Sequence, residues 1–230
     1  MMGMHGESWV NHAIQEADLL LAFGMRFDDR VTGNLKTYAP NARKIHIDID
    51  PSEVNKNVRV DAAIVADLRE TLRELLDRLE PANHAAWLKY IGSMKGDTAV
   101  RDIQSLPDHG HLYAAHVIHD IWRLTEGNAI ISTDVGQHQM WEAQYYHHDQ
   151  PRTLITSGGL GTMGFGLPGS IGACFAHDRR KTISVNGDGG FMFTMPEMAT
   201  AANHGINVVA VVFNDSGFGN VRRAQQTIFE

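Results

Sequence analysis

Two stretches of the sequence decide the fold: Thr182-Ile-Ser-Val-Asn-Gly-Asp-Gly-Gly190 and Val208-Val-Ala-Val-Val-Phe-Asn214. Each contains a short apolar run, which is typical of a buried strand in a parallel sheet, and each ends in polar or glycine residues. The segment between them is long enough for one strand–helix–strand crossover. We therefore expect Asp188 and Asn214 at the carboxyl ends of neighbouring strands.

The same alternation continues towards the amino terminus. Strands are predicted at 19–23, 44–50, 62–66, 129–133 and 153–156, and helices at 8–17, 68–79, 111–124, 138–146 and 168–176. Asp67 and Thr194 are placed to cap the helices that follow them, each with a glutamate three positions later. This order predicts an α/β fold with two parallel-sheet, Rossmann-like units. We place the first unit at residues 1–80, a linker at 81–110 and the second unit at 111–230.

Composition excludes several classes of protein. The chain has 230 residues and a formal net charge of -7, without the basic stripe that nucleic-acid binding requires. Cys174 is the only cysteine, so no disulfide framework is expected and a reducing, cytoplasmic setting fits. The amino terminus lacks the plan of a signal peptide, and no apolar run is long enough to span a bilayer. We expect neither a nucleic-acid nor a membrane partner.

Polar or glycine-rich segments follow four strands of the predicted second unit, at 134–139, 157–164, 187–190 and 214–216. Ligands of open α/β sheets bind at this edge, so the four segments should face one crevice. The carboxylate of Asp188 and the amide oxygen of Asn214 are hard ligands that suit Mg²⁺, which usually also binds substrate phosphates. The plainer interpretation is that both residues only end strands in turns.

A rival interpretation comes from Gly159-Leu-Gly161-Thr-Met-Gly164, which matches the G-x-G-x-x-G pattern of dinucleotide-binding proteins. The protein would then be a nicotinamide-dependent oxidoreductase, with Asp188 binding the ribose. This pattern alone is weak. It requires neither a second glycine after the acid nor an asparagine one crossover later.

Narrower motifs carry a closer resemblance. They are Gly136-Gln-His-Gln-Met-Trp141, Thr156-Ser-Gly-Gly-Leu-Gly-Thr-Met-Gly164, Arg26-Phe-Asp-Asp-Arg-Val-Thr-Gly33, Gly3-Met-His-Gly6 and His46-Ile-Asp-Ile-Asp-Pro51. Together with Gly187-Asp-Gly and Asn214, they resemble the large catalytic subunit of the acetolactate synthase family of thiamine-diphosphate enzymes. The resemblance implies decarboxylation of pyruvate and its ligation to a second 2-oxoacid, as in branched-chain amino acid biosynthesis.

The resemblance also implies roles for individual residues. Mg²⁺ would be held by the side chains of Asp188 and Asn214 and by the backbone carbonyl of Ser216. Met163 would support the thiazolium ring, and Gln139 would face the substrate. Further contacts to thiamine diphosphate would come from Gly136, Gln137, His138, Leu160, Gly161, Gly187, Gly189 and Gly190.

The first unit would be the second half of a central domain that holds FAD as a structural cofactor. Its implied FAD contacts are Met4, His5, Gly24, Arg26, Asp28, Arg30, Asp48 and Asp67. A solvated run of local ion pairs is the plainer interpretation of residues 26–30.

The same resemblance implies a fragment. The family's pyrimidine-binding domain, with its essential glutamate, should precede residue 1, and the diphosphate domain should continue past residue 230. We expect a homo-oligomer, dimer or tetramer, in which that domain is supplied in trans, with a possible regulatory subunit. The chain alone should be inactive.

Ala224 departs from the family, where a tryptophan favours 2-oxobutyrate as acceptor, so the preferred 2-oxoacid is open. Two alternatives stay open beside the nicotinamide enzyme. One is another thiamine-diphosphate decarboxylase or carboligase, and the other is a non-catalytic module that binds FAD or a nucleotide.

Overall fold

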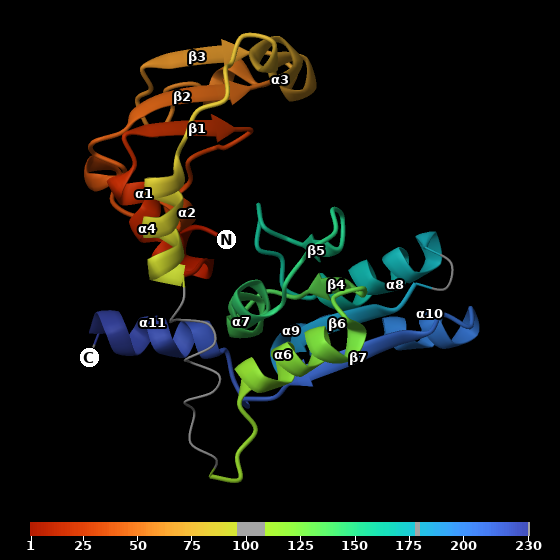
Figure 1. Cartoon of the computed structure of the whole chain (residues 1–230). Coiled ribbons are helices and arrows are strands. Elements are labelled where there is room, and N and C mark those ends of the chain that lie inside the picture. The colour runs from red at the N-terminus through yellow and green to blue at the C-terminus, as the bar shows by residue number, and fades with distance from the viewer. Residues whose placement is uncertain (96–108, 178–179, 230) are drawn as a thin grey trace. The chain divides into compact units, whose positions relative to one another are not determined.

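We describe a computed structural model of the chain, which covers residues 1–95, 109–177 and 180–229. The chain divides into two compact units, Met1–Gln104 and Ser105–Glu230 (Figure 1). Each unit contains one parallel sheet, so the α/β fold class predicted from the sequence is confirmed. Among the described helices, none combines the length and apolar character that crossing a membrane requires.

The first unit is built on a three-stranded parallel sheet in the order β1-β2-β3 (Figure 1). Its elements are η1 (Gly3–His5), α1 (Ser8–Glu16), β1 (Leu19–Phe23), α2 (Asp29–Thr32), η2 (Leu35–Thr37), β2 (Arg43–Asp48), η3 (Pro51–Glu53), β3 (Ala62–Val65), α3 (Leu68–Leu76) and α4 (Ala85–Lys95). Helix α4 lies inside the segment that the sequence predicts as a linker. The core of this unit contains Ala22, Phe27, Tyr38 and Val58.

The second unit contains a four-stranded parallel sheet in the order β5-β4-β6-β7. Its elements are α6 (Ala114–Thr125), β4 (Ile130–Thr133), α7 (Gln137–Tyr145), β5 (Leu154–Thr156), α8 (Gly166–Ala176), β6 (Thr182–Gly187), α9 (Asp188–Thr194), α10 (Glu197–Asn203), β7 (Val208–Phe213) and α11 (Gly219–Phe229). Helices connect each strand to the next, and all strands run parallel. Their carboxyl ends therefore lie at one edge of the sheet.

Helices cover both faces of this sheet, because alternate residues of a strand point to opposite sides. One core cluster joins Ile118 of α6 and Tyr146, directly after α7, to Ile131, Ile183 and Val185 of the strands. A second cluster joins Leu167 and Ile171 of α8 with Ala201 of α10. The central strands β4 and β6 are therefore buried on both sides, as their near-continuous apolar sequences predicted, whereas β5 and β7 at the edges are only partly buried.

Two helix caps predicted from the sequence have different outcomes. Asp67 caps α3 as expected, since its carboxylate accepts hydrogen bonds from the backbone N–H groups of Arg69 and Glu70. The cap assigned to Thr194 is wrong: α10 begins after Pro196 without a side-chain cap. Thr194 instead ends α9, and its hydroxyl donates to the carbonyl of Gly164 at 3.0 Å. The reason is that α9 spans residues 188–194. Thr194 is therefore the last residue of one helix and does not lie directly before the next.

Candidate functional site

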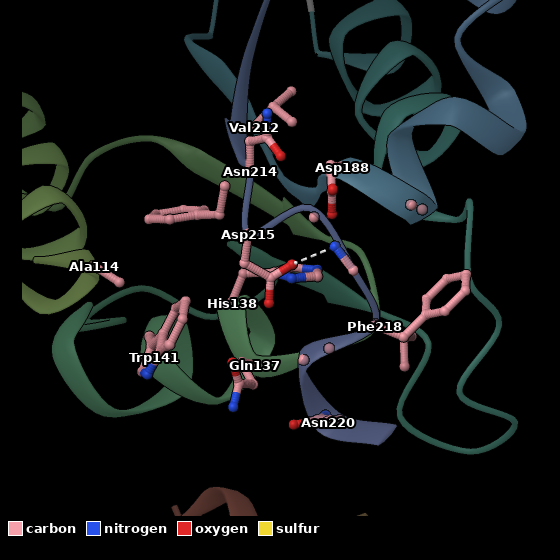
Figure 2. A pocket seen from close by; sticks show the side chains of 18 of the residues that line it. Ala114, Gln137, His138, Trp141, Asp188, Val212, Asn214, Asp215, Phe218 and Asn220 are labelled. Atoms are coloured by element: carbon pink, nitrogen blue, oxygen red, sulfur yellow. Dashed lines mark hydrogen bonds between the residues drawn. The ribbon is translucent and has the colours of Figure 1, made fainter. Parts of the chain in front are cut away.

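A cavity of about 720 Å³ opens at the carboxyl edge of the second sheet (Figure 2). It is lined by segments that follow β4, β5, β6 and β7, so the structure brings the four strand-end segments to one place. The lining residues that the sequence had singled out are Gly136, Gln137, His138, Gly161, Met163, Gly187, Asp188, Gly189, Gly190 and Asn214.

Asp188 and Asn214 are neighbours because of the pairing of β6 with β7. Gly187 pairs with Phe213 in the parallel register, so the next residue of each strand lies beside its counterpart. Figure 2 shows both side chains on the same side of the cavity. In the part of the chain that the structure describes, the Asp188 carboxylate has no ion pair or hydrogen bond to another group. It is therefore available to a ligand.

The turn after β7 holds the Asn214 side chain. Its Oδ1 accepts a hydrogen bond from the backbone N–H of Ser216 at 3.0 Å. Ser216 has a φ of 56°, which is left-handed and bends the chain back at this point. Ser216 itself does not line the cavity.

The donors at this site suit a cation that also binds an anionic ligand. No group of three or more histidine, cysteine, aspartate and glutamate side chains within the described ranges could hold a metal. A cation beside Asp188 and Asn214 would therefore need backbone oxygens, water or phosphate oxygens to complete its shell. Mg²⁺ is usually bound in this way, through few protein ligands and a phosphate-bearing partner.

The first turn of α7 provides donors for an anion. Gly136 precedes the helix, and no side chain caps its amino terminus. Gly136, Gln137 and His138 all line the cavity. The first N–H groups of a helix lack partners inside the helix, and the helix dipole favours negative charge there. An anionic group in the cavity would satisfy these donors, which is the arrangement at many phosphate sites.

His138 is buried in this wall, with 6% of its surface exposed. Burial lowers the pKa of its imidazole to about 4, although the negative charges of Asp134, Asp215 and Asp188 oppose this shift. The ring donates to the backbone carbonyl of Asp134, while Nε2 is buried without a partner in the described structure. Such an unsatisfied polar atom is costly, so it marks a place where a ligand atom would fit.

This pKa predicts how stability depends on pH. An unfolded histidine has a pKa near 6.5, so between pH 6.5 and about 4 the unfolded state binds more protons than the folded state. The free energy of unfolding should therefore fall as the pH is lowered through this window, by at most about 3 kcal/mol from His138. Urea titrations of the parent and of His138→Gln check this. The parent should lose more stability, and parallel profiles would contradict the prediction.

Three residues that the resemblance placed at the cofactor or substrate differ in their position relative to the cavity: Leu160, Met163 and Gln139. Met163 lines the cavity, whereas Leu160 is 93% exposed and does not. Gln139 also lies outside the lining, and its side-chain amide donates to the hydroxyl of Thr156 at 2.8 Å. Thr156 in turn accepts a hydrogen bond from Thr133, so Gln139 ties α7 to the ends of β4 and β5.

Several residues of the site were not singled out from the sequence. Asp134 is fully buried directly after β4, beneath the cavity. Asp215 and Phe218 line the cavity in the turn before α11, and Trp141 lines it from α7. For Asp134 a signal existed, because it follows an apolar strand in the same way as Asp188.

In the first unit, five of the predicted FAD residues lie in or beside η1 and α2. Arg26 forms an ion pair with Asp28 at 3.0 Å, and Asp28 also caps α2 through the N–H of Arg30. Burial and the charge of Arg30 lower the pKa of His5, against the opposing charge of Asp28. Met4 lies in η1 beside His5 and is half exposed.

The other three lie at the carboxyl edge of the first sheet. Gly24 follows β1 with a φ of 57°, Asp48 ends β2, and Asp67 follows the third strand as the cap of α3. Asp48 accepts a hydrogen bond from the N–H of Asp50 and lies 3.6 Å from Nε2 of His46. The Asp48 carboxylate thus stabilises the turn after β2, and the Asp67 carboxylate stabilises the first turn of α3.

Comparison with known proteins identifies both units. The family profile described as "Thiamine pyrophosphate enzyme, C-terminal TPP binding domain" matches residues 134–230, and the profile of the central domain of the same enzymes matches residues 1–75. Thiamine pyrophosphate is another name for thiamine diphosphate.

Similar proteins are described as acetolactate synthases. The acetolactate synthase isozyme 1 large subunit of Escherichia coli is 40% identical over all of this chain and 40% of its own length. A probable acetolactate synthase large subunit of Methanocaldococcus jannaschii is 41% identical over all of the chain and 40% of its own length. Acetolactate synthase 1, chloroplastic, of Nicotiana tabacum is 42% identical over 96% of the chain and 34% of its own length.

The chain spans about two fifths of the length of these relatives or less. Its first unit matches a central domain and its second unit matches a cofactor-binding domain, and these matches do not favour the nicotinamide interpretation. The chain therefore belongs to the thiamine pyrophosphate enzymes.

Proposed function

We propose that the second unit binds thiamine diphosphate with Mg²⁺, and that the protein acts as an acetolactate synthase. In that reaction pyruvate is decarboxylated and joined to a second 2-oxoacid, giving a 2-acetohydroxyacid. The observation that carries the proposal is the pairing of β6 with β7, which sets an unpartnered Asp188 beside Asn214 in the cavity. The names of the relatives support the choice of reaction.

The residues present fit this cofactor. Asp188, the side chain of Asn214 and the carbonyl of Ser216 would hold Mg²⁺ against the diphosphate. The amino terminus of α7, whose first turn includes Gln137 and His138, would bind diphosphate oxygens through its backbone N–H groups. Met163 would lie against the thiazolium ring, with Gly161 beside it in the cavity wall. Thiamine diphosphate, when bound, supplies the carbanion chemistry, and these side chains supply position and charge.

Glycines shape the wall on the α9 side. A Cβ atom at Gly189 would come within 2.8 Å of the Phe218 ring, and one at Gly190 within 2.7 Å of the Asp134 carboxyl carbon. Side chains at these two positions would therefore clash with the ring of Phe218 and the carboxylate of Asp134, so the first turn of α9 requires glycine there.

Calorimetric titration with thiamine diphosphate tests the proposal. We expect binding in the presence of Mg²⁺ and at least tenfold weaker binding with EDTA, because the cation offsets repulsion between the diphosphate and the site's carboxylates. Titrations with NAD and FAD under the same conditions test the two other classes of function. Tight binding of NAD, with none of thiamine diphosphate, would overturn the proposal.

We further propose that the first unit contributes to an FAD site. The guanidinium of Arg26 pairs with Asp28 and that of Arg30 with Asp29, and the imidazole of His5 lies within the field of Arg30 and Asp28. Gly24 and Asp48 lie at the ligand-binding edge of the first sheet. A dinucleotide has a diphosphate for the cations and ribose hydroxyls for the acids. Flavin absorbance near 450 nm in the purified protein, lost in Arg26→Ala but retained in Arg59→Ala, would support this site.

Assembly follows from the relatives' description as large subunits. We propose that the protein assembles with further copies of itself, as a dimer or tetramer, and that a separate regulatory subunit binds the assembly. Light scattering coupled to gel filtration measures the first part. A strictly monomeric mass at micromolar concentration would contradict it.

Substrate choice depends on Ala224 in this proposal. Ala224 lies on exposed α11, one turn beyond the cavity-lining Val221. Without an aromatic wall there, the active enzyme should prefer 2-oxobutyrate over pyruvate as acceptor weakly or not at all. Ala224→Trp should raise that preference about tenfold, as expected for contact with one extra methyl group.

A competition assay with both acceptors measures the effect. Gln225→Trp is the matched control, because it adds the same ring at the next position, on another side of the helix. A strong preference for 2-oxobutyrate in the parent, or equal effects of the two tryptophans, would contradict the role of Ala224.

A further inference from the structure

The peptide of Gly164 is held from both sides, although it belongs to a glycine-rich loop. Its N–H donates to both carboxylate oxygens of Asp134, at 3.0 and 2.9 Å. Its carbonyl accepts a hydrogen bond from the hydroxyl of Thr194 at 3.0 Å. Gly164 has a φ of 85°, and a Cβ atom there would lie 3.2 Å from Phe193 and Thr194. Asp134, Gly164 and Thr194 therefore form a clamp that joins the ends of β4 and α9 to the loop.

A fully buried carboxylate such as that of Asp134 is unusual where its only role is to accept a structural hydrogen bond. The Asp134 side chain is fully buried, and no cation among the described residues pairs with it. Within the described structure, the only other hydrogen bond to its carboxylate comes from the N–H of Val135, at 2.6 Å. Burying a charge is costly, and a neutral side chain could cap a single N–H group with less desolvation. A carboxylate differs in offering two equivalent oxygens, between which the N–H of Gly164 is centred.

Two hydrogen bonds within the loop before Gly164 converge on Ser157. Within it, the N–H of Gly161 donates to the carbonyl of Ser157, and the N–H of Thr162 donates to the Ser157 hydroxyl. Both of these bonds are internal to the loop, and Leu160 at its tip is exposed. Met163 lines the cavity and directly precedes Gly164. The clamp therefore fixes the peptide that directly follows Met163 relative to the sheet.

We propose that Asp134 is a positioning residue for Met163, with Thr194 acting on the same peptide from the other side. Asp134 touches no ligand in this arrangement; it acts through the Gly164 peptide. The proposal rests on the proposed function only in naming what Met163 supports, the thiazolium ring of thiamine diphosphate. If it is correct, loss of the clamp weakens contact with the thiazolium ring more than contact with the diphosphate.

The experiment uses the 230-residue chain with Asp134→Asn, Thr194→Val and Thr194→Ser. Asp134→Asn keeps the shape but replaces one of the two oxygens that accept the N–H of Gly164 by an NH₂ group, which cannot accept it. Thr194→Val removes the hydroxyl, and Thr194→Ser restores it. Thr227→Val is the matched control, because its hydroxyl also donates to a backbone carbonyl, that of Arg223 on α11. Two readouts follow: NMR of the Met163 methyl and the Gly164 amide, and binding of thiamine diphosphate and of inorganic pyrophosphate, both with Mg²⁺.

Asp134→Asn and Thr194→Val should speed hydrogen exchange of the Gly164 amide at least tenfold and shift the Met163 methyl signal. They should weaken thiamine diphosphate about tenfold more than pyrophosphate. Thr194→Ser and Thr227→Val should resemble the parent. Unchanged Met163 and Gly164 signals would overturn the proposal, as would equal weakening of both ligands, which a merely structural role predicts.

Two further results remain decisive. If Asp134→Asn does not fold, the pair Thr194→Val and Thr194→Ser tests the same clamp from its other side. If the parent does not bind thiamine diphosphate, the proposed function fails, while the NMR signals still show whether the clamp positions Met163.

Discussion

Asp188→Ala is expected to weaken magnesium-dependent binding of thiamine diphosphate by at least about 100-fold, since even residues behind a metal ligand alter metal affinity by 10–100-fold. The fold should stay intact. In the described structure, the Asp188 carboxylate has no hydrogen bond or ion pair that its removal would break. Calorimetric titration with and without Mg²⁺ measures the loss, and thermal unfolding monitors the fold.

Asp215→Asn is the matched control for this variant. Asp215 also lines the cavity, and its Oδ1 accepts a hydrogen bond from the N–H of Gly217, which an asparagine oxygen can replace. Asp215→Asn removes one negative charge beside the same ligand and should leave binding equal or stronger. If instead Asp188→Ala binds with unchanged magnesium dependence and Asp215→Asn does not, the cation ligand has been assigned to the wrong carboxylate.

Two glycines of α8 should respond in opposite directions to the same substitution. A Cβ atom at Gly166 would lie 2.5 Å from Oδ1 of Asn186 and 2.7 Å from the backbone nitrogen of Asp134. Both neighbours are fully buried, and a backbone atom of a strand end cannot move aside easily. Gly166→Ala should therefore destabilise the protein by about 1–3 kcal/mol or more, as overpacking does.

Gly172→Ala provides the control on the same helix, because a Cβ atom there meets nothing within 4 Å. Alanine at this position should raise the free energy of unfolding by about 0.5–1 kcal/mol, through its better helix propensity. Urea denaturation of both variants measures the contrast. Equal changes in stability would mean that α8 does not lie against the carboxyl ends of β4 and β6 as described.

The strands and their polar ends could be predicted because local patterns determine them. A short apolar run that stops at Asp188 or Asn214 specifies a buried strand and the edge where its last side chain lies. Asp67 could be predicted as a cap for a similar reason: a cap requires only the donors of the next turn, which are close in the sequence.

Features that depend on distant segments could not be predicted in this way. Thr194 matches a local capping pattern, yet its hydroxyl bonds to Gly164, 30 positions earlier. Gln139 directly follows the cavity-lining residues of its motif, but its side chain donates a hydrogen bond to Thr156 at the end of β5. Asp134 carried the same local signal as Asp188, and only the tertiary structure separates a carboxylate buried beneath the cavity from one that faces it.

The pairing of Gly187 with Phe213 has a consequence for how this part of the protein can change. The distance between the two proposed magnesium ligands is set by hydrogen bonds between two strands, and the helices connecting those strands do not determine it. Insertions in the turn before β7, around Gly205, should therefore be tolerated without moving Asn214. A single residue inserted within β7 would turn Asn214 to the opposite face of the sheet, because side chains alternate along a strand. The crossover is free to vary in length, whereas the register of the six residue pairs between β6 and β7 is not.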